Sequence, residues 1–345
     1  MKTLILALLI AAASATLLLT TGPAYEGSAG FTKARAYAPV RQQDIDFHLW
    51  YPANAGGRSI TVGGNGVFYG TPAGKGAPAR EGRHPVVIIS HGAGGNAGQF
   101  GWIAAQLAQA GFVVALPNHP GTTSRNASAS AAVRVWERPQ DVSAVIDRIT
   151  ASPQDFPYAD PNRIGVLGFS AGGYTAMALA GARVDPEALA QFCDDSDHGM
   201  SDCAFLAKAG IDLHQIDLSP AAADLRDPRV KTGVIIDPGI IQTITLESLR
   251  AMPVPLQIIN LDDPVPAGVD AAKAASVIPR AEYHRIKAAS HFSFLANCKP
   301  RGAEILRDEG EPDLLCADGQ GTDRQAIHDE LATLILPYLT RMLKP

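Results

Sequence analysis

Residues 163–173 read Arg163-Ile164-Gly165-Val166-Leu167-Gly168-Phe169-Ser170-Ala171-Gly172-Gly173, an apolar run that leads directly into a Gly-x-Ser-x-Gly motif. A segment with helical spacing, Ala171 to Ala180, follows without a gap. A nucleophile elbow needs this order, because a sharp turn between a strand and a helix lifts its serine above the edge of a sheet. The motif therefore predicts Ser170 as a nucleophile. The alternative is an ordinary capping serine in a glycine-rich turn.

Apolar runs alternate with helical segments on both sides of this motif. Unbroken apolar runs such as Pro85 to Ser90 are typical of strands that are buried on both faces. The alternation predicts an α/β chain with a mostly parallel sheet covered by helices on both faces. The expected strands are 46–51, 85–90, 112–116, 163–167, 230–236, 254–259 and 283–286; the expected helices are 99–110, 138–150, 171–180 and 322–343, the last interrupted or bent near Pro337.

Two segments interrupt this alternation. Residues 53–84 are glycine-rich and are expected to form a hairpin and loops. Residues 183–229 are acidic and irregular, and we interpret them as an insertion over one end of the sheet, after the nucleophile helix. Because no linker divides the chain, residues 25–345 are predicted to form a single catalytic domain.

The composition excludes several classes of protein. Of the 345 residues, 46% are hydrophobic and 18% are charged, which is unlike a disordered chain, a collagen or a small disulfide scaffold. The 29 Lys and Arg residues face 34 Asp and Glu residues, for a net charge of −5. Because no run is rich in Lys or Arg, we expect no nucleic-acid partner.

The first 24 residues resemble an export signal. Lys2 is their first charge, an apolar stretch follows from Leu4 to Ala13, and small residues suited to cleavage lie at 13–15 and near Ala24. The alternative is a retained membrane anchor, but the apolar stretch is barely long enough to span a bilayer. We therefore predict a signal peptide at 1–24, a secreted or periplasmic protein, and no stable membrane insertion after cleavage.

Four cysteines follow this signal, and an even number in an exported chain favours two disulfides. Among the three connectivities, we expect the close pairs Cys193–Cys203 and Cys298–Cys316, which would staple polar surface loops. A zinc site is the alternative, but no Cys-x-x-Cys spacing supports it.

A serine nucleophile needs a histidine as its base. In elbow-type folds the nucleophile, the acid and the histidine follow one another along the chain. His291 is the best candidate, because it follows the last expected strand by a few residues and can reach over the edge of the sheet. The other histidines after Ser170 lie in the insertion, in a strand or in the last helix: His198, His214, His284 and His328.

The acid that orients His291 is open between two aspartates. Asp263 follows the expected strand 254–259 and is the first choice, and Asp237, which follows the strand 230–236, is the alternative. Both occupy the carboxyl ends of strands, where the site residues of open α/β sheets collect. Asp262 is a third option. Those that do not serve are expected to cap a helix or brace a turn.

A second glycine-rich loop can supply oxyanion donors. It reads Ser90-His91-Gly92-Ala93-Gly94-Gly95 and follows the strand 85–90. The backbone N–H of Ala93, or of Gly94, would form an oxyanion hole together with that of Ala171. A phosphate-binding loop is the alternative, but the Lys-Ser/Thr pair of such a loop is missing.

Together these motifs resemble the α/β-hydrolase superfamily, and within it the branch of platelet-activating-factor acetylhydrolases and bacterial predicted dienelactone hydrolases. The matching segments are 49–52, 90–95, 111–115, 118–121, 168–173 and 291–295. The resemblance implies a twisted, mostly parallel sheet, Ser170 as nucleophile, His291 as base, and Ala93 and Ala171 as oxyanion donors, with no metal or organic cofactor.

The resemblance is divided on the acid and on the substrate. Acetylhydrolase-like members carry the acid at the position of Asp237, whereas the commoner arrangement, which includes the bacterial relatives, matches Asp263. True dienelactone hydrolases have a cysteine where this chain has Ser170, so the lactone substrate is not implied.

The expected function is that of a serine carboxylic-ester hydrolase acting on small-molecule or lipid esters, for example short-chain or acetylated ones. The alternatives are a serine peptidase or polyester hydrolase on the same fold, and a catalytically silent binding protein. The sequence does not indicate an oligomeric state.

Overall fold

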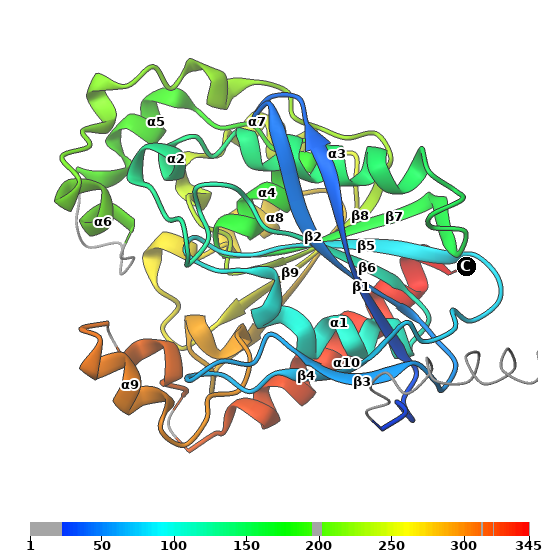
Figure 1. Ribbon diagram of the computed structural model, residues 1–345. Coiled ribbons are helices and arrows are strands. Elements are labelled where there is room, and N and C mark those ends of the chain that lie inside the picture. The colour runs from blue at the N-terminus through cyan, green and yellow to red at the C-terminus, as the bar shows by residue number, and fades with distance from the viewer. Residues whose placement is uncertain (1–22, 195–201, 312, 320, 345) are drawn as a thin grey trace, which may run out of the picture.

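The computed structural model describes residues 23–194, 202–311, 313–319 and 321–344 (Figure 1). Its centre is a ten-stranded sheet in the order β10-β9-β8-β7-β5-β6-β2-β1-β4-β3. The strands are β1 Ala29–Ala38, β2 Gln43–Pro52, β3 Arg58–Val62, β4 Thr71–Lys75, β5 His84–Ser90, β6 Val113–Pro117, β7 Ala159–Phe169, β8 Val230–Ile236, β9 Leu256–Leu261 and β10 Ala281–Ile286.

The middle of the sheet is parallel from β10 to β6, and β2 joins β6 in the antiparallel direction. Every residue of β6 and of β9 is buried, as expected for strands covered on both faces. The carboxyl ends of β5, β7, β8 and β9 therefore meet at one edge, which positions the site. The predicted α/β architecture with a mostly parallel sheet is confirmed.

Helices cover both faces of this sheet (Figure 1). One core packs α3 and α4 against it, and the other packs α1 and α10 against the opposite face. The α-helices are α1 Gly101–Gln109, α2 Ala129–Val133, α3 Glu137–Thr150, α4 Ala171–Ala180, α5 Pro186–Ala190, α6 Asp202–Lys208, α7 Leu246–Arg250, α8 Ala272–Val277, α9 Gly302–Asp308 and α10 Arg324–Leu343.

The predicted elements agree with this structure except at the edge of the sheet and in the last helix. α4 and β8 have the predicted bounds, and β3 and β4 form the hairpin expected within residues 53–84. The strand β1 was not predicted. α10 is continuous through Pro337, so the expected interruption is wrong.

The insertion at 183–229 contains α5 and α6, which gather with α2 at one end of the sheet (Figure 1). A disulfide joins Cys193 to Cys203 within it, and a second joins Cys298 to Cys316, the pairing expected from the sequence. The predicted signal peptide lies outside the described residues except for Pro23 and Ala24. In the described part of the chain, no helix is both long and apolar enough to cross a membrane.

Candidate active site

Ser170 sits on the sharp turn between β7 and α4, with φ 56° and ψ −122°. A non-glycine residue with positive φ is strained, and such strain is typical of functional turns. The flanking glycines make the turn possible. A Cβ on Gly168 would lie 1.9 Å from the carbonyl oxygen of Gly172, and a Cβ on Gly172 would lie 1.9 Å from that of Ser90. The backbone thus has the shape that the sequence motif predicted.

The structure brings His291 to Asp237. Nδ1 of His291 lies 2.9 Å from Oδ2 of Asp237, which is the first residue after β8. The backbone N–H of Ser170 donates to the carbonyl of Ile236, the residue before Asp237. The ring of Phe169 lies 4.7 Å from the ring of His291, centre to centre. These contacts place serine, histidine and aspartate at one edge of the sheet.

Asp237 is itself held in place. It is fully buried, and its Oδ1 accepts hydrogen bonds from Nδ2 of Asn260 at 2.8 Å and from the N–H of Leu261 at 2.9 Å. These two donors hold one oxygen of the buried carboxylate in a fixed position. Its second oxygen is then directed at His291, so that Nδ1 carries the ring proton and Nε2 is the basic nitrogen.

Asp263, the first choice from the sequence, does not contact His291. Its carboxylate pairs with Arg285 and lies 3.9 Å from Nζ of Lys287, and its side chain is 43% exposed. Asp262 accepts a hydrogen bond from the N–H of Asp263 and also lies outside the site. His291 thus contacts the alternative acid, Asp237, and not the first choice, Asp263. The strand β9, which precedes Asp263, lies one strand farther than β8 from β7, the strand that leads to Ser170.

The two expected oxyanion donors have open N–H groups. Gly94, the other option in the first loop, donates its N–H to the carbonyl of Thr122 at 3.0 Å. Among the described residues, the N–H groups of Ala93 and Ala171 donate to no protein acceptor. Gly239 keeps the second one accessible, since a Cβ there would lie 3.3 Å from the nitrogen of Ala171. Ala171 also begins α4, whose positive dipole end favours a negative oxygen.

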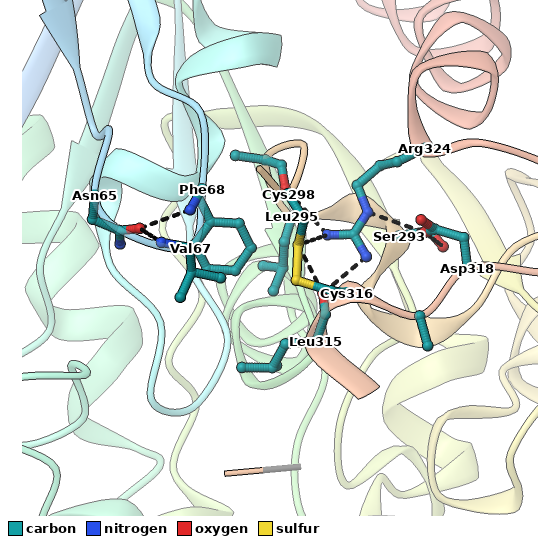
Figure 2. The surroundings of a disulfide bond; sticks show 12 residues. Asn65, Val67, Phe68, Ser293, Leu295, Cys298, Leu315, Cys316, Asp318 and Arg324 are labelled. Carbon is teal, nitrogen blue, oxygen red and sulfur yellow. Dashed lines mark hydrogen bonds and ion pairs between the residues drawn. A yellow bond between two sulfur atoms is a disulfide. The ribbon is translucent and has the colours of Figure 1, made fainter. Parts of the chain in front are cut away.

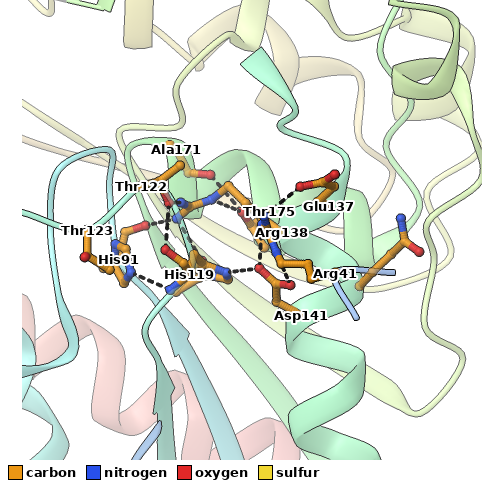
Figure 3. A network of polar contacts seen from close by, with 12 residues as sticks. Arg41, His91, His119, Thr122, Thr123, Glu137, Arg138, Asp141, Ala171 and Thr175 are labelled. Carbon is orange, nitrogen blue, oxygen red and sulfur yellow. Dashed lines mark hydrogen bonds and ion pairs between the residues drawn. The ribbon is translucent and has the colours of Figure 1, made fainter. Parts of the chain in front are cut away.

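The loop that carries Ala93 is braced by Arg138, a fully buried arginine of α3 (Figure 3). Its guanidinium donates to the carbonyl of His91, to Oγ1 of Thr122 at 2.7 Å and to Oγ1 of Thr175 at 3.2 Å. Burial lowers the pKa of Arg138 to about 9, so the group stays cationic at neutral pH. It therefore ties the loop that carries Ala93 to both α3 and α4.

Two histidines complete this network. Nδ1 of His91 faces the carbonyl of Gly92 at 2.7 Å and must donate, so its Nε2 accepts the N–H of His119 at 3.1 Å. His119 contacts Oδ2 of Asp141 through Nδ1 at 2.8 Å and Oγ of Ser90 through Nε2 at 2.9 Å. Burial, reinforced by Arg138, lowers the pKa of both histidines well below 6.5, so both rings are neutral.

Ser90, His119 and Asp141 thus form a second serine–histidine–aspartate chain. All three are buried, with at most 2% of each residue exposed, so a substrate cannot reach this serine. These three hydrogen-bonded residues support the loop that carries Ala93. Arg41 completes it by a two-pronged ion pair to Asp141, at 2.6 and 2.8 Å, and a further contact with Glu137 at 2.6 Å. Sequence reasoning missed this network, whose members come from four separate segments.

The segment that holds His291 is braced separately, near the second disulfide (Figure 2). Oγ of Ser293 donates to Asp318 at 2.6 Å, and Arg324 donates to the same carboxylate at 3.0 Å. Arg324 also reaches the carbonyl of Leu315 at 2.8 Å, beside Cys316. The disulfide, the arginine and the aspartate therefore fix the segment that carries the histidine.

A cavity of about 390 Å³ adjoins these groups. Ala93, Ala171 and Gly239 lie on one side of it, and residues of the insertion form another. A cavity of this size lies at the low end for small-molecule sites. Among the described residues, no cluster of three His, Cys, Asp or Glu side chains is suited to hold a metal ion.

Comparison with solved structures shows which fold the chain has. A ferulic acid esterase from Streptomyces cinnamoneus superposes with a TM-score of 0.61 at 16% identity, covering 94% of this chain and 92% of that one. The chain therefore has the α/β-hydrolase fold. A model of the Dienelactone hydrolase family also matches residues 72–196 of this chain, a range that includes Ser170 but ends before Asp237 and His291.

An acylaminoacyl peptidase from Pyrococcus horikoshii superposes on this chain with a TM-score of 0.51 at 16% identity. The match covers 92% of this chain but only 42% of the peptidase, so the chain spans less than half of that protein. The comparison with curated sequences gives no match. The family model supports a hydrolase, and the two neighbours show the fold.

Proposed function

We propose that the protein is a serine carboxylic-ester hydrolase with Ser170 as nucleophile, His291 as general base and Asp237 as the acid. The observation that carries this proposal is the contact of 2.9 Å between His291 and Asp237 beside a strained serine elbow. The open N–H groups of Ala93 and Ala171 support a further part of the proposal, that these two groups form an oxyanion hole at the same edge of the sheet.

The proposed reaction has two halves. Nε2 of His291 takes the proton of the Ser170 hydroxyl as its oxygen attacks the ester carbonyl, and Asp237 stabilises the imidazolium that forms. The N–H groups of Ala93 and Ala171 bind the tetrahedral oxyanion. His291 then protonates the leaving alcohol, and water, activated by the same histidine, releases the acid from Ser170.

The cavity bears on the choice of ester. Its walls are largely apolar, and its volume is greater than an acetyl group needs, which favours substrates with longer or bulkier groups. The two disulfides support an oxidising compartment, outside the cell or in the periplasm. Short-chain and lipid-derived esters are both compatible with this site.

Hydrolysis of p-nitrophenyl esters from C2 to C12, by the wild type and by Ser170→Ala, tests the proposal. We expect activity that falls by about 10⁴-fold or more in the variant, and labelling of the wild type by a fluorophosphonate at Ser170. Folded wild type that neither hydrolyses any ester nor takes up the label would contradict it. Activity confined to peptide substrates would support a peptidase instead.

A further inference from the structure

The cavity beside the oxyanion donors has mostly apolar walls. They come from α2 and the loops on either side of it, from the insertion and from the segment that follows β8: Ala127, Ala132, Val133, Val135, Leu189, Phe192, Phe205, Leu206, Leu213 and Ile240. Among the described residues that line it, Asp202 and Glu311 are the two carboxylates. Glu311 is exposed to water, whereas Asp202, at the start of α6, is half-buried. Asp202 is therefore the carboxylate that a bound molecule would desolvate.

Arg138, a cation that also lines the cavity, is already balanced by other acids. The buried network beneath the cavity contains two arginines, Arg41 and Arg138, and two carboxylates, Glu137 and Asp141. His91 and His119 are neutral, so the charges of the network cancel without Asp202. The guanidinium of Arg138 also donates to His91, Thr122 and Thr175 rather than to Asp202.

Asp202 therefore contributes a surplus negative charge to an apolar cavity. Among the described residues, it forms no ion pair. Burial raises the pKa of Asp202, and the nearby His291 and Arg138 only partly oppose this effect. A carboxylate in this position is costly to desolvate unless a cation or a hydrogen-bond donor accompanies it.

The aromatic side chains of the cavity favour a cation. Phe192, Phe205 and Tyr174 line the same space as Asp202. Aromatic faces attract cations, and an ammonium group bound by aromatic rings next to a carboxylate is a recurring arrangement in proteins. An apolar cavity of this kind also accepts the methyl groups of a quaternary ammonium without a hydrogen-bond penalty.

We propose that the cavity selects ester substrates that carry an ammonium group, quaternary or protonated, and that Asp202 is the residue that determines this specificity. The inference deepens the proposed esterase function and rests on it. A substrate whose ester lies at Ala93 and Ala171 would place its cationic group in the cavity against Asp202. Neutral esters of the same shape would bind without this interaction.

Pairs of esters that differ only in charge test the proposal. In the first pair the charge lies on the acyl side: p-nitrophenyl 4-(trimethylammonio)butyrate against p-nitrophenyl 5,5-dimethylhexanoate. In the second it lies on the alcohol side: butyrylcholine against 3,3-dimethylbutyl butyrate. The ratio of kcat/KM within each pair is compared between the wild type and Asp202→Asn, so that the intrinsic reactivity of each ester cancels.

We expect the ratio of the charged to the neutral ester to fall by about tenfold in Asp202→Asn for at least one pair, while kcat/KM for the neutral esters changes little. Asp202→Glu should keep the preference. Glu311→Gln is the matched control, because it also removes one carboxylate from the cavity lining, but an exposed one that water screens. If the ratio of the charged to the neutral ester is the same in Asp202→Asn as in the wild type for both pairs, the proposal is overturned. A fall of the same size in Glu311→Gln would also overturn it.

A measurement on the unaltered protein separates this inference from the esterase function. Butyltrimethylammonium should bind the wild type in calorimetry and should compete with neutral esters, whether or not cationic esters are turned over. Active protein with no such binding would contradict the inference but leave the esterase function in place. Binding that depends on Asp202, without hydrolysis of any ester, would contradict the proposed function alone.

Discussion

Asp237 Oδ2 lies 2.9 Å from Nδ1 of His291, although the two residues are 54 positions apart in the chain. The contact exists because β8 ends at the edge of the sheet where the short helical turn from His291 to Phe294 begins. Asn260 and the N–H of Leu261, from the neighbouring strand β9, fix the other oxygen of Asp237. The aspartate is thus oriented by one strand while it orients a histidine on another segment.

The acid can be assigned by two matched variants. In Asp237→Asn, turnover of p-nitrophenyl butyrate should fall by about 10⁴-fold, because the histidine would lose the partner that sets its tautomer. Asp263→Asn removes an exposed carboxylate bound to Arg285 and should leave turnover unchanged. Steady-state kinetics of both proteins would check this. A greater loss in Asp263→Asn than in Asp237→Asn would mean that the acid is misassigned.

Gly239→Ala should weaken the oxyanion hole. The added Cβ would lie 3.3 Å from the nitrogen of Ala171 and would crowd the position of a bound oxyanion. Removal of one oxyanion donor costs about 10²–10³ in kcat, so partial obstruction should lower kcat by about tenfold or more. KM for a small ester should change little. The same kcat as in the wild type would show that the N–H of Ala171 does not act in the reaction.

Arg138→Met should lower kcat with little change in KM, because the loop that carries Ala93 would lose its hydrogen bond at the carbonyl of His91. We expect a loss of about tenfold to a hundredfold, in protein that is still folded at the assay temperature. Arg148→Met is the matched control, since Arg148 lies on the same helix but forms an exposed pair with Asp155. A rise in KM at constant kcat would indicate that Arg138 binds substrate rather than positioning the loop.

Stability should fall as the pH drops from about 6.5 to about 4. Burial lowers the pKa of His328 from 6.5 to about 4, so the folded state keeps this ring neutral while the unfolded state binds a proton. The neutral ring stabilises the folded state fully above pH 6.5. By pH 4 the free energy of unfolding should be lower by about 3 kcal/mol. Urea unfolding at several pH values measures the slope. It should become shallower in His328→Gln, and an unchanged slope would rule out this histidine as a source.

Loss of the second disulfide should affect both stability and turnover. Replacing Cys298 and Cys316 by serine opens a loop of 18 residues and should lower the free energy of unfolding by about 3 kcal/mol. Because the disulfide lies beside the segment that carries His291, kcat should fall as well. The same replacement at Cys193 and Cys203 should change KM instead, since that pair adjoins the cavity. The same changes in kcat and KM after replacement of either cysteine pair would contradict this prediction.

The sequence predicted the nucleophile because the elbow is local. Gly168, Ser170 and Gly172 lie within five positions, and the strand before them and the helix after them can be recognised from the same stretch of chain. The acid stayed open between Asp263 and Asp237 in the sequence, because it is decided between strands. Asp237 and Asp263 both follow buried strands, and only the register of β8 against β9 and the position of His291 distinguish them.

The oxyanion network was missed for a similar reason. His91, His119, Arg138 and Asp141 are ordinary residues of a loop, a turn and a helix in the sequence, and none has a motif of its own. The strand β1 was missed because it lies toward the edge of the sheet, where exposed residues such as Lys33 and Arg35 obscure an apolar pattern. Contacts across the sheet, rather than along the chain, account for both omissions.

The ion pair between Arg41 and Asp141 has a consequence for recombining this protein with other hydrolases. Arg41 belongs to the turn between β1 and β2, far from Ser170 in the chain, yet it completes the support of the loop that carries Ala93. A chimera that exchanges the first two strands would separate the two partners and leave a buried carboxylate unpaired. The amino-terminal hairpin and the helix α3 therefore form one exchangeable unit and should be transferred together.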